Sequence, residues 1–386
     1  MEFLNQDNVR ELIDTEIKGS AVTVYIPMTS AGSSPGILEK QTRFRDLMKQ
    51  AATRVEEKDP SSKLLKEFKQ KEAELMADDS FWQDQTQGLL ICASEGVWKT
   101  FHLPYETEEY VSVNDSYFLA PVLSILSDAQ DYYVLTIVQQ NPKLFKGDMY
   151  GLREADLTLP KDIIAADHID EKNQKSENQG SAVGSSMNTG WYNGRGGAKN
   201  PQENDRMKYF RIIDNAVNKF VHDNTPLILA GIDSEIAEYR GMSKYPNILQ
   251  THIGGSHGDA RAHQLLAEAQ HIIEEEVVRP AHQAAIESYE NIHGAFPERS
   301  ADNKADIVEA AEQGRVGTLL VRITRATTNA VKGTLDAATR ITFPDPEMSE
   351  TLNQLAIKVW KMSGKIIGLS NDEMPHGAPM LAQLRY

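Results

Sequence analysis

Short apolar runs of strand length alternate with helical segments along the whole chain, and this alternation constrains the fold more than any other feature. Runs such as AVTVYIP (21–27), YYVLTIV (132–138) and GTLLVRI (317–323) are rich in β-branched and aromatic residues, which favour strands. GLLICAS (88–94) and VWKTFHLP (97–104) read as a strand pair joined at Glu95 and Gly96. Helices are expected at 37–58 and 203–223, where apolar residues recur every three to four positions. Alternation of this kind predicts a three-layer α/β fold.

The length of 386 residues is enough for several domains, each with its own core. We predict three, at 1–127, 128–256 and 257–386. The second begins with YYVLTIV, and KLFKGDMYG (143–151) reads as its hairpin partner. The third begins near His257 with a long helical run that Pro280 interrupts.

Composition limits the compartment and the partners. The net charge of −16 argues against a general binder of nucleic acid, DNA included, because affinity for phosphate needs a positive surface. Cys92 is the single cysteine, so no internal disulfide is possible. The first residues lack the pattern of a secretion signal, and no apolar run approaches the ~20 residues that cross a bilayer. We therefore expect a cytoplasmic protein without a membrane role.

One stretch is locally basic and has no apolar periodicity. GWYNGRGGAKNP (190–201) offers aromatic faces for base stacking, cations for phosphates and glycines that let the backbone approach a ligand. Over residues 191–211 there are five cations and only two carboxylates. The candidate RNA-binding residues are Trp191, Tyr192, Gly194, Arg195, Gly196, Gly197, Ala198, Lys199, Arg206, Lys208 and Arg211. The alternative is a flexible surface loop whose cations arose by chance.

A second group of cations lies in the first domain. Lys40, Arg43, Arg45 and Lys49 occupy the helix expected at 37–58, and cations three to four positions apart share a side. Arg43 is the candidate RNA contact in this group. The alternative interpretation is a solvated helix face.

The order of motifs resembles a known family. GRGG is followed by a basic helix, the strand PLILAG, the turn HIGGSHG and an acidic helical stretch. The segment NKADIVEAAEQGRVGTLLV and the final LRY add further similarity. In this order the chain resembles the archaeo-eukaryotic class I peptide-chain release factors and Pelota, and in particular their bacterial branch of Balon-like ribosome hibernation or rescue factors.

The resemblance implies an architecture and partners. It implies a mixed α/β N-terminal domain that faces the decoding centre, an RNase H-like middle domain with the GRGG loop, and a three-layer, ribosomal-protein-like C-terminal domain that docks a GTPase. The implied partners are the ribosome, through rRNA of the A site, and a translational GTPase such as elongation factor Tu. No cofactor, metal or catalytic residue is implied.

Two departures from the family pattern shape the expected function. The hydrolytic Gly-Gly-Gln motif of the family becomes Gly196, Gly197 and Ala198, so the amide that helps to place the attacking water is missing. The Asn-Ile-Lys-Ser loop that reads stop codons is also absent. The expected function is A-site occupation in hibernation or rescue, without codon reading or ester hydrolysis. The alternatives are a peptidyl-tRNA hydrolase that works with Ala198, and a protein-binding scaffold that has lost the ribosome.

The histidines predict no metal or hydrolase site. His257, Asp259 and His263 are close in sequence, but their spacing suits neither a zinc site nor a catalytic triad. His271, His282 and His293 are eleven residues apart. We expect all three of them to be partly exposed surface residues.

Overall fold

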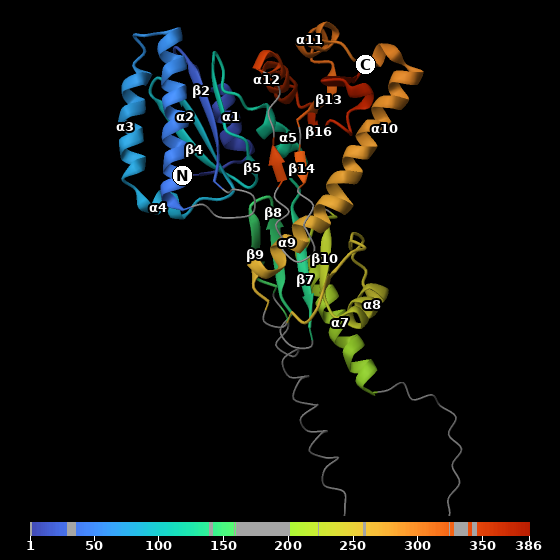
Figure 1. Cartoon of the computed structure of the whole chain (residues 1–386). Coiled ribbons are helices and arrows are strands. Elements are labelled where there is room, and N and C mark those ends of the chain that lie inside the picture. The colour runs from blue at the N-terminus through green and yellow to red at the C-terminus, as the bar shows by residue number, and fades with distance from the viewer. Residues whose placement is uncertain are drawn as a thin grey trace, which may run out of the picture. The chain divides into compact units, whose positions relative to one another are not determined.

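The computed structural model of the chain describes residues 2–28, 36–138, 142–157, 159, 201–222, 224–257, 260–323, 325–327, 339–341 and 346–386. The chain folds into two compact units. Unit 1 contains Met1–Ala129 and Val277–Tyr386, and unit 2 contains Gln130–Glu276. Figure 1 shows that helices and strands alternate in both units, which confirms the mixed α/β class. The predicted division into three domains stays a prediction. Among the described helices, none has the length and apolar character to cross a membrane.

The N-terminal half of unit 1 is a sheet with the strand order β1-β4-β3-β2-β6. Its strands are β1 (Glu2–Phe3), β2 (Ala21–Pro27), β3 (Gly88–Ser94), β4 (Val97–Leu103) and β6 (Tyr110–Asn114). The predicted hairpin of β3 and β4 is confirmed, and Gly96 takes a φ of 76° at its turn. The helices are α1 (Gln6–Asp14), α2 (Ile37–Lys58), α3 (Leu64–Met76) and α4 (Asp79–Gln83).

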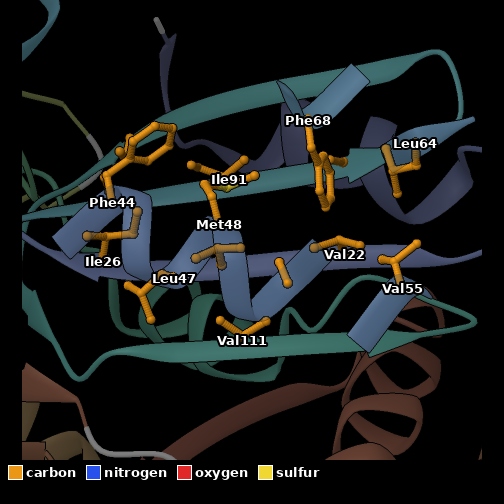
Figure 2. Packing of buried hydrophobic residues seen from close by; sticks show 14 of the residues in the cluster. Val22, Ile26, Phe44, Leu47, Met48, Val55, Leu64, Phe68, Ile91 and Val111 are labelled. Atoms are coloured by element: carbon orange, nitrogen blue, oxygen red, sulfur yellow. The ribbon is translucent and has the colours of Figure 1, made fainter. Parts of the chain in front are cut away.

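Helix α2 supplies much of the core of this half. Its apolar stripe is buried as its periodicity predicts. Figure 2 shows Phe44, Leu47 and Met48 packed with side chains from the strands, including Ile26 and Ile91. Burying a side chain of this size contributes roughly 1.5–3 kcal/mol relative to exposure.

The C-terminal half of unit 1 is built on a second sheet with the order β12-β17-β13-β16. Its strands are β12 (Ser300–Ala301), β13 (Val316–Arg322), β16 (Lys365–Leu369) and β17 (Met380–Leu384). A small sheet joins β14 (Arg325–Thr327), β15 (Thr339–Ile341) and β5 (Glu106–Thr107). The helices are α5 (Ala120–Asp128), α10 (Arg279–Ala295), α11 (Lys304–Glu312) and α12 (Pro346–Lys361), with short 3-10 turns at Pro297–Arg299 and Pro375–Gly377.

Unit 2 has a sheet with the order β11-β10-β7-β8-β9. The strands are β7 (Tyr132–Ile137), β8 (Leu144–Asp148), β9 (Gly151–Ala155), β10 (Leu227–Gly231) and β11 (Ile253–Gly254). β7, β8 and β9 form an antiparallel meander, and β10 runs parallel to both β7 and β11. The helices are α7 (Pro201–Phe220), α8 (Asp233–Met242) and α9 (Ala262–Ile273), and a π-helix at Glu274–Val278 follows α9.

Candidate nucleic-acid interface

The predicted loop falls outside the described residues, but the helix that follows it is described. Trp191, Tyr192, Gly194, Arg195, Gly196, Gly197, Ala198 and Lys199 all lie outside the described part of the chain. In unit 2, β9 precedes the loop and α7 follows it. The roles predicted for the loop residues stay predictions, and the described site is α7.

Helix α7 has one buried and one exposed face. Phe210, Ile213 and Val217 are fully buried against the sheet of unit 2. On the exposed side, four residues follow one another at helical spacing, and together we name them the basic stripe: Lys208, Arg211, Asn215 and Lys219. Between residues 206 and 219 the only carboxylate is that of Asp214, which is buried. The helix itself therefore contributes only cations to this exposed face between residues 206 and 219, although the whole chain is acidic.

Arg206 does not belong to the stripe. Its Nη2 donates to Glu238 Oε1 on α8 at 2.5 Å, and both side chains are partly buried. This ion pair ties α7 to α8 and compensates the charge of Arg206 locally. Of the three cations predicted on α7, Lys208 and Arg211 are exposed and share a side, whereas Arg206 is paired within the fold.

A buried carboxylate fixes α7 from the other side. Asp214 is 3% exposed and accepts hydrogen bonds from the Ser243 hydroxyl and, at 3.2 Å, from the Lys244 backbone N–H. The Tyr239 hydroxyl lies 3.5 Å from the same carboxylate. Burial, followed by the charge of Asp214, raises the pKa of Tyr239 far above its usual value. Tyr239 stays neutral at any physiological pH, and the basic stripe is presented by an anchored helix.

Two of the four cations predicted on α2 are held inside unit 1, and the other two, Arg45 and Lys49, are exposed. The Arg43 guanidinium donates to Pro27 O at 2.6 Å and contacts Glu39 and Glu109 at 3.1 and 3.2 Å. Lys40 is buried, donates to Trp82 O at 3.3 Å, and burial lowers its pKa. The RNA contact predicted for Arg43 stays a prediction, and the structure shows this side chain engaged with two carboxylates.

One histidine prediction is wrong. His282 is only 5% exposed, and its Nε2 lies 3.0 Å from Asp128 Oδ1. The surface interpretation failed because the partner on α5 is 154 positions away in sequence, so no local pattern could reveal the pair. His271 is exposed, as expected, and the His293 Nδ1 lies 2.9 Å from the Ser300 hydroxyl.

The described part of the chain contains no candidate metal site, because no three or more His, Cys, Asp or Glu side chains there are placed so that they could hold a metal ion. His252 lies 3.0 Å from Asp233, and His257 lies 3.1 Å from the carbonyl oxygen of Gly254. Asp259 lies outside the described residues.

Comparison with known proteins gives a family for unit 2. Residues 132–275 match the family described as bacterial archaeo-eukaryotic release factor family 7, and this range coincides with unit 2 to within two residues at either end. No curated protein sequence matches the chain significantly.

Several solved structures are similar at low identity. Archaeoglobus fulgidus Pelota is 13% identical, with 77% of this chain and 79% of that chain covered and a TM-score of 0.31. Dom34 of S. cerevisiae, described as a translation termination-like factor, is 10% identical, with 72% and 74% covered and a TM-score of 0.36. Archaeal Pelota in a ribosome-bound model with ABCE1 is 13% identical, with 100% and 95% covered and a TM-score of 0.38.

Unit 2, with its basic helix after the glycine-rich segment in the sequence, is the release-factor-like part of the chain. Residues 132–275 are similar to the family described as bacterial archaeo-eukaryotic release factor family 7. The predicted resemblance is confirmed at this level. The Balon-like branch stays a prediction.

Proposed function

We propose that this protein is a ribosome-binding translation factor that occupies the A site in the manner of a tRNA, in ribosome hibernation or rescue. The observation that carries the proposal is the position of the basic stripe. It lies on the helix that follows GRGG, within the range that matches a release-factor family. Lys208 and Arg211 can neutralise rRNA phosphates, and Asn215 can donate hydrogen bonds to phosphate or sugar.

The anchoring of α7 supports a binding role. A helix held by an ion pair to Glu238 and by the buried Asp214 has little backbone conformational entropy left to lose when its cations bind. The stripe alone is too small for tight binding, because each phosphate contact contributes only modestly. We therefore propose that the loop, with Arg195, Lys199 and the aromatic pair Trp191 and Tyr192, supplies the remaining contacts.

We further propose that the protein does not hydrolyse the peptidyl-tRNA ester. At the position of the family's glutamine, Ala198 offers a backbone N–H but no side-chain amide. Placement of the attacking water supplies much of the rate in such reactions, so its loss leaves a loop that binds without cleaving. A translational GTPase such as elongation factor Tu is proposed as the partner that assists delivery.

Co-sedimentation with vacant ribosomes at several salt concentrations tests the proposal. The variant Lys208→Gln/Arg211→Gln is compared with the wild type and with Lys66→Gln/Lys69→Gln, which removes two exposed cations from α3. Removal of two phosphate contacts lowers the slope of log affinity against log salt by about 2. The α3 variant should behave as the wild type does. Unchanged affinity and slope in the α7 variant would remove the stripe from the interface.

A further inference from the structure

Three arginines meet at one edge of the C-terminal sheet. β13 runs parallel to β16 and antiparallel to β17, so the start of β13 and the end of β17 lie at the same edge. β12 pairs antiparallel with the end of β17. This topology brings together Arg299 before β12, Arg315 before β13 and Arg385 after β17.

Main-chain carbonyl groups hold these arginines in place. Arg299 Nη2 donates to Arg385 O at 3.1 Å, and Arg385 Nη2 donates to Met362 O at 2.6 Å. Arg315 Nε and Nη2 donate to Tyr386 O at 3.2 and 2.8 Å. Within the described residues, no aspartate or glutamate forms an ion pair with any of the three. Arg315 Nη1 also donates to Gln313 Oε1 at 3.4 Å. Each guanidinium still keeps Nη hydrogens that these bonds do not use and that can donate to an external anion.

Large apolar side chains are exposed at the same edge. Phe296 is 52% exposed, Met362 49% and Tyr386 68%. The Arg299 backbone N–H donates to Phe296 O at 2.9 Å, and the Arg315 guanidinium lies 5.8 Å from the centre of the Tyr386 ring. We name this surface the arginine edge, formed by Phe296, Arg299, Arg315, Met362, Arg385 and Tyr386. In Figure 1 it lies near the C label, in the region of α10 and α11.

We propose that the arginine edge docks a protein partner through a segment that presents carboxylates beside apolar side chains. Oriented guanidinium groups bind carboxylates in two-pronged geometry, so the charge of the edge selects an acidic segment. The composition favours protein over RNA, because aromatic residues, methionine and arginine are the types enriched in protein interfaces. Met362 has no ring for base stacking, and one face of Tyr386 already contacts Arg315. The proposal is independent of ribosome binding.

The test is a binding measurement without ribosomes. The probe is a fluorescein-labelled synthetic peptide that alternates glutamate with leucine and phenylalanine, and its control is the same peptide with glutamine for glutamate. Fluorescence anisotropy compares the wild type with Arg299→Gln/Arg385→Gln and with the matched variant Lys66→Gln/Lys69→Gln on α3. We expect saturable, salt-sensitive binding of the glutamate peptide, weakened at least about tenfold by loss of the two arginines. The glutamine peptide should bind weakly, and the α3 variant should bind as the wild type does.

A second variant guards against misfolding, since Arg299 and Arg385 donate to main-chain carbonyls. Met362→Glu leaves those hydrogen bonds in place and puts a competing carboxylate at the edge, so it should weaken peptide binding to a similar degree.

Three results would overturn the proposal. The first is that the wild type does not bind the glutamate peptide, or that both edge variants bind it as tightly as the wild type does. The second is preference for a single-stranded RNA of equal charge over the peptide. The third is a concentration-dependent dimer of the wild type that both edge variants lose in sedimentation, which would assign the edge to a second copy of this chain.

Discussion

Asn353 on α12 caps helix α5 from a distant part of the chain, and replacing it with alanine should destabilise unit 1 strongly. Its Oδ1 accepts from the backbone N–H groups of Leu119 at 2.7 Å and Ala120 at 3.1 Å. Its Nδ2 donates to Tyr117 O at 2.8 Å and to the Ser116 hydroxyl at 3.2 Å. The side chain is 3% exposed, so water has little access to replace it.

The magnitude follows from the groups left without partners. Asn353→Ala leaves two N–H groups at the start of α5 without an acceptor, and each buried group without a partner costs about 1–3 kcal/mol. Leu119, at the N-cap, has no side-chain cap of its own. We therefore expect a loss of about 3 kcal/mol in the free energy of unfolding, or roughly 6–12 °C in Tm for a domain of this size.

Urea unfolding followed by tryptophan fluorescence measures this loss. Asn291→Ala, at an exposed position of α10, is the control and should stay within about 0.5 kcal/mol of the wild type. Asn353→Asp keeps the acceptor but loses both donors, and it should fall between the wild type and the alanine variant. A loss below about 1 kcal/mol for Asn353→Ala would refute the reasoning, because it would mean that the capped N–H groups find other partners.

Three further substitutions have expected outcomes. His282→Ala removes one partner of the buried Asp128 carboxylate on α5, so it should cost about 3 kcal/mol in urea unfolding, whereas His271→Ala at an exposed position should cost little. In the Glu276→Gln variant, the free energy of unfolding should fall less steeply as the pH is lowered into the acid range. Burial alone would raise the pKa of Glu276, but hydrogen bonds from two backbone N–H groups hold it below its usual value. The stability from Glu276 is therefore present above the usual glutamate pKa and is lost as pH falls through the lowered one. Gly147→Ala should cost about 1–3 kcal/mol, since a Cβ there would lie 2.3 Å from Tyr132 Cζ.

Each of these three predictions would be contradicted by one specific result. Equal losses for the two histidine variants would remove the buried pair as the cause. If the free energy of unfolding depends on acid pH in the same way in Glu276→Gln and in the wild type, the Glu276 carboxylate keeps its ordinary pKa. Wild-type unfolding of Gly147→Ala would mean that the Tyr132 ring moves aside at no cost.

Local patterns predicted those elements whose signal lies within one segment. The stripe of α2 is buried at Phe44, Leu47 and Val55 as its periodicity indicates. The β3–β4 hairpin turns at Gly96, where a positive φ favours glycine. Strand β7 and its partner β8 were also predicted, because both are rich in apolar residues next to turn residues.

Other features depend on contacts that a single sequence does not reveal. α8 (Asp233–Met242) was not predicted, since only Ile236 and Tyr239 are buried along it. The π-helix after α9 was predicted only as part of an acidic helical stretch, whereas Glu276 accepts hydrogen bonds from the backbone N–H groups of Gln250 and Thr251. The ion pair of Arg206 with Glu238 also depends on tertiary packing, and so the sequence overstated the number of cations available on α7.

Competition with A-site tRNA tests the central claim most directly. Fluorescently labelled protein is bound to vacant ribosomes, and A-site tRNA is titrated against it, with P-site tRNA as the control. We expect the protein and A-site tRNA to exclude each other, the protein and P-site tRNA to bind together, and no release of peptide when the P-site tRNA carries one. Saturable binding that A-site tRNA does not displace would contradict A-site occupation, and release of the peptide would contradict a loop that binds without cleaving.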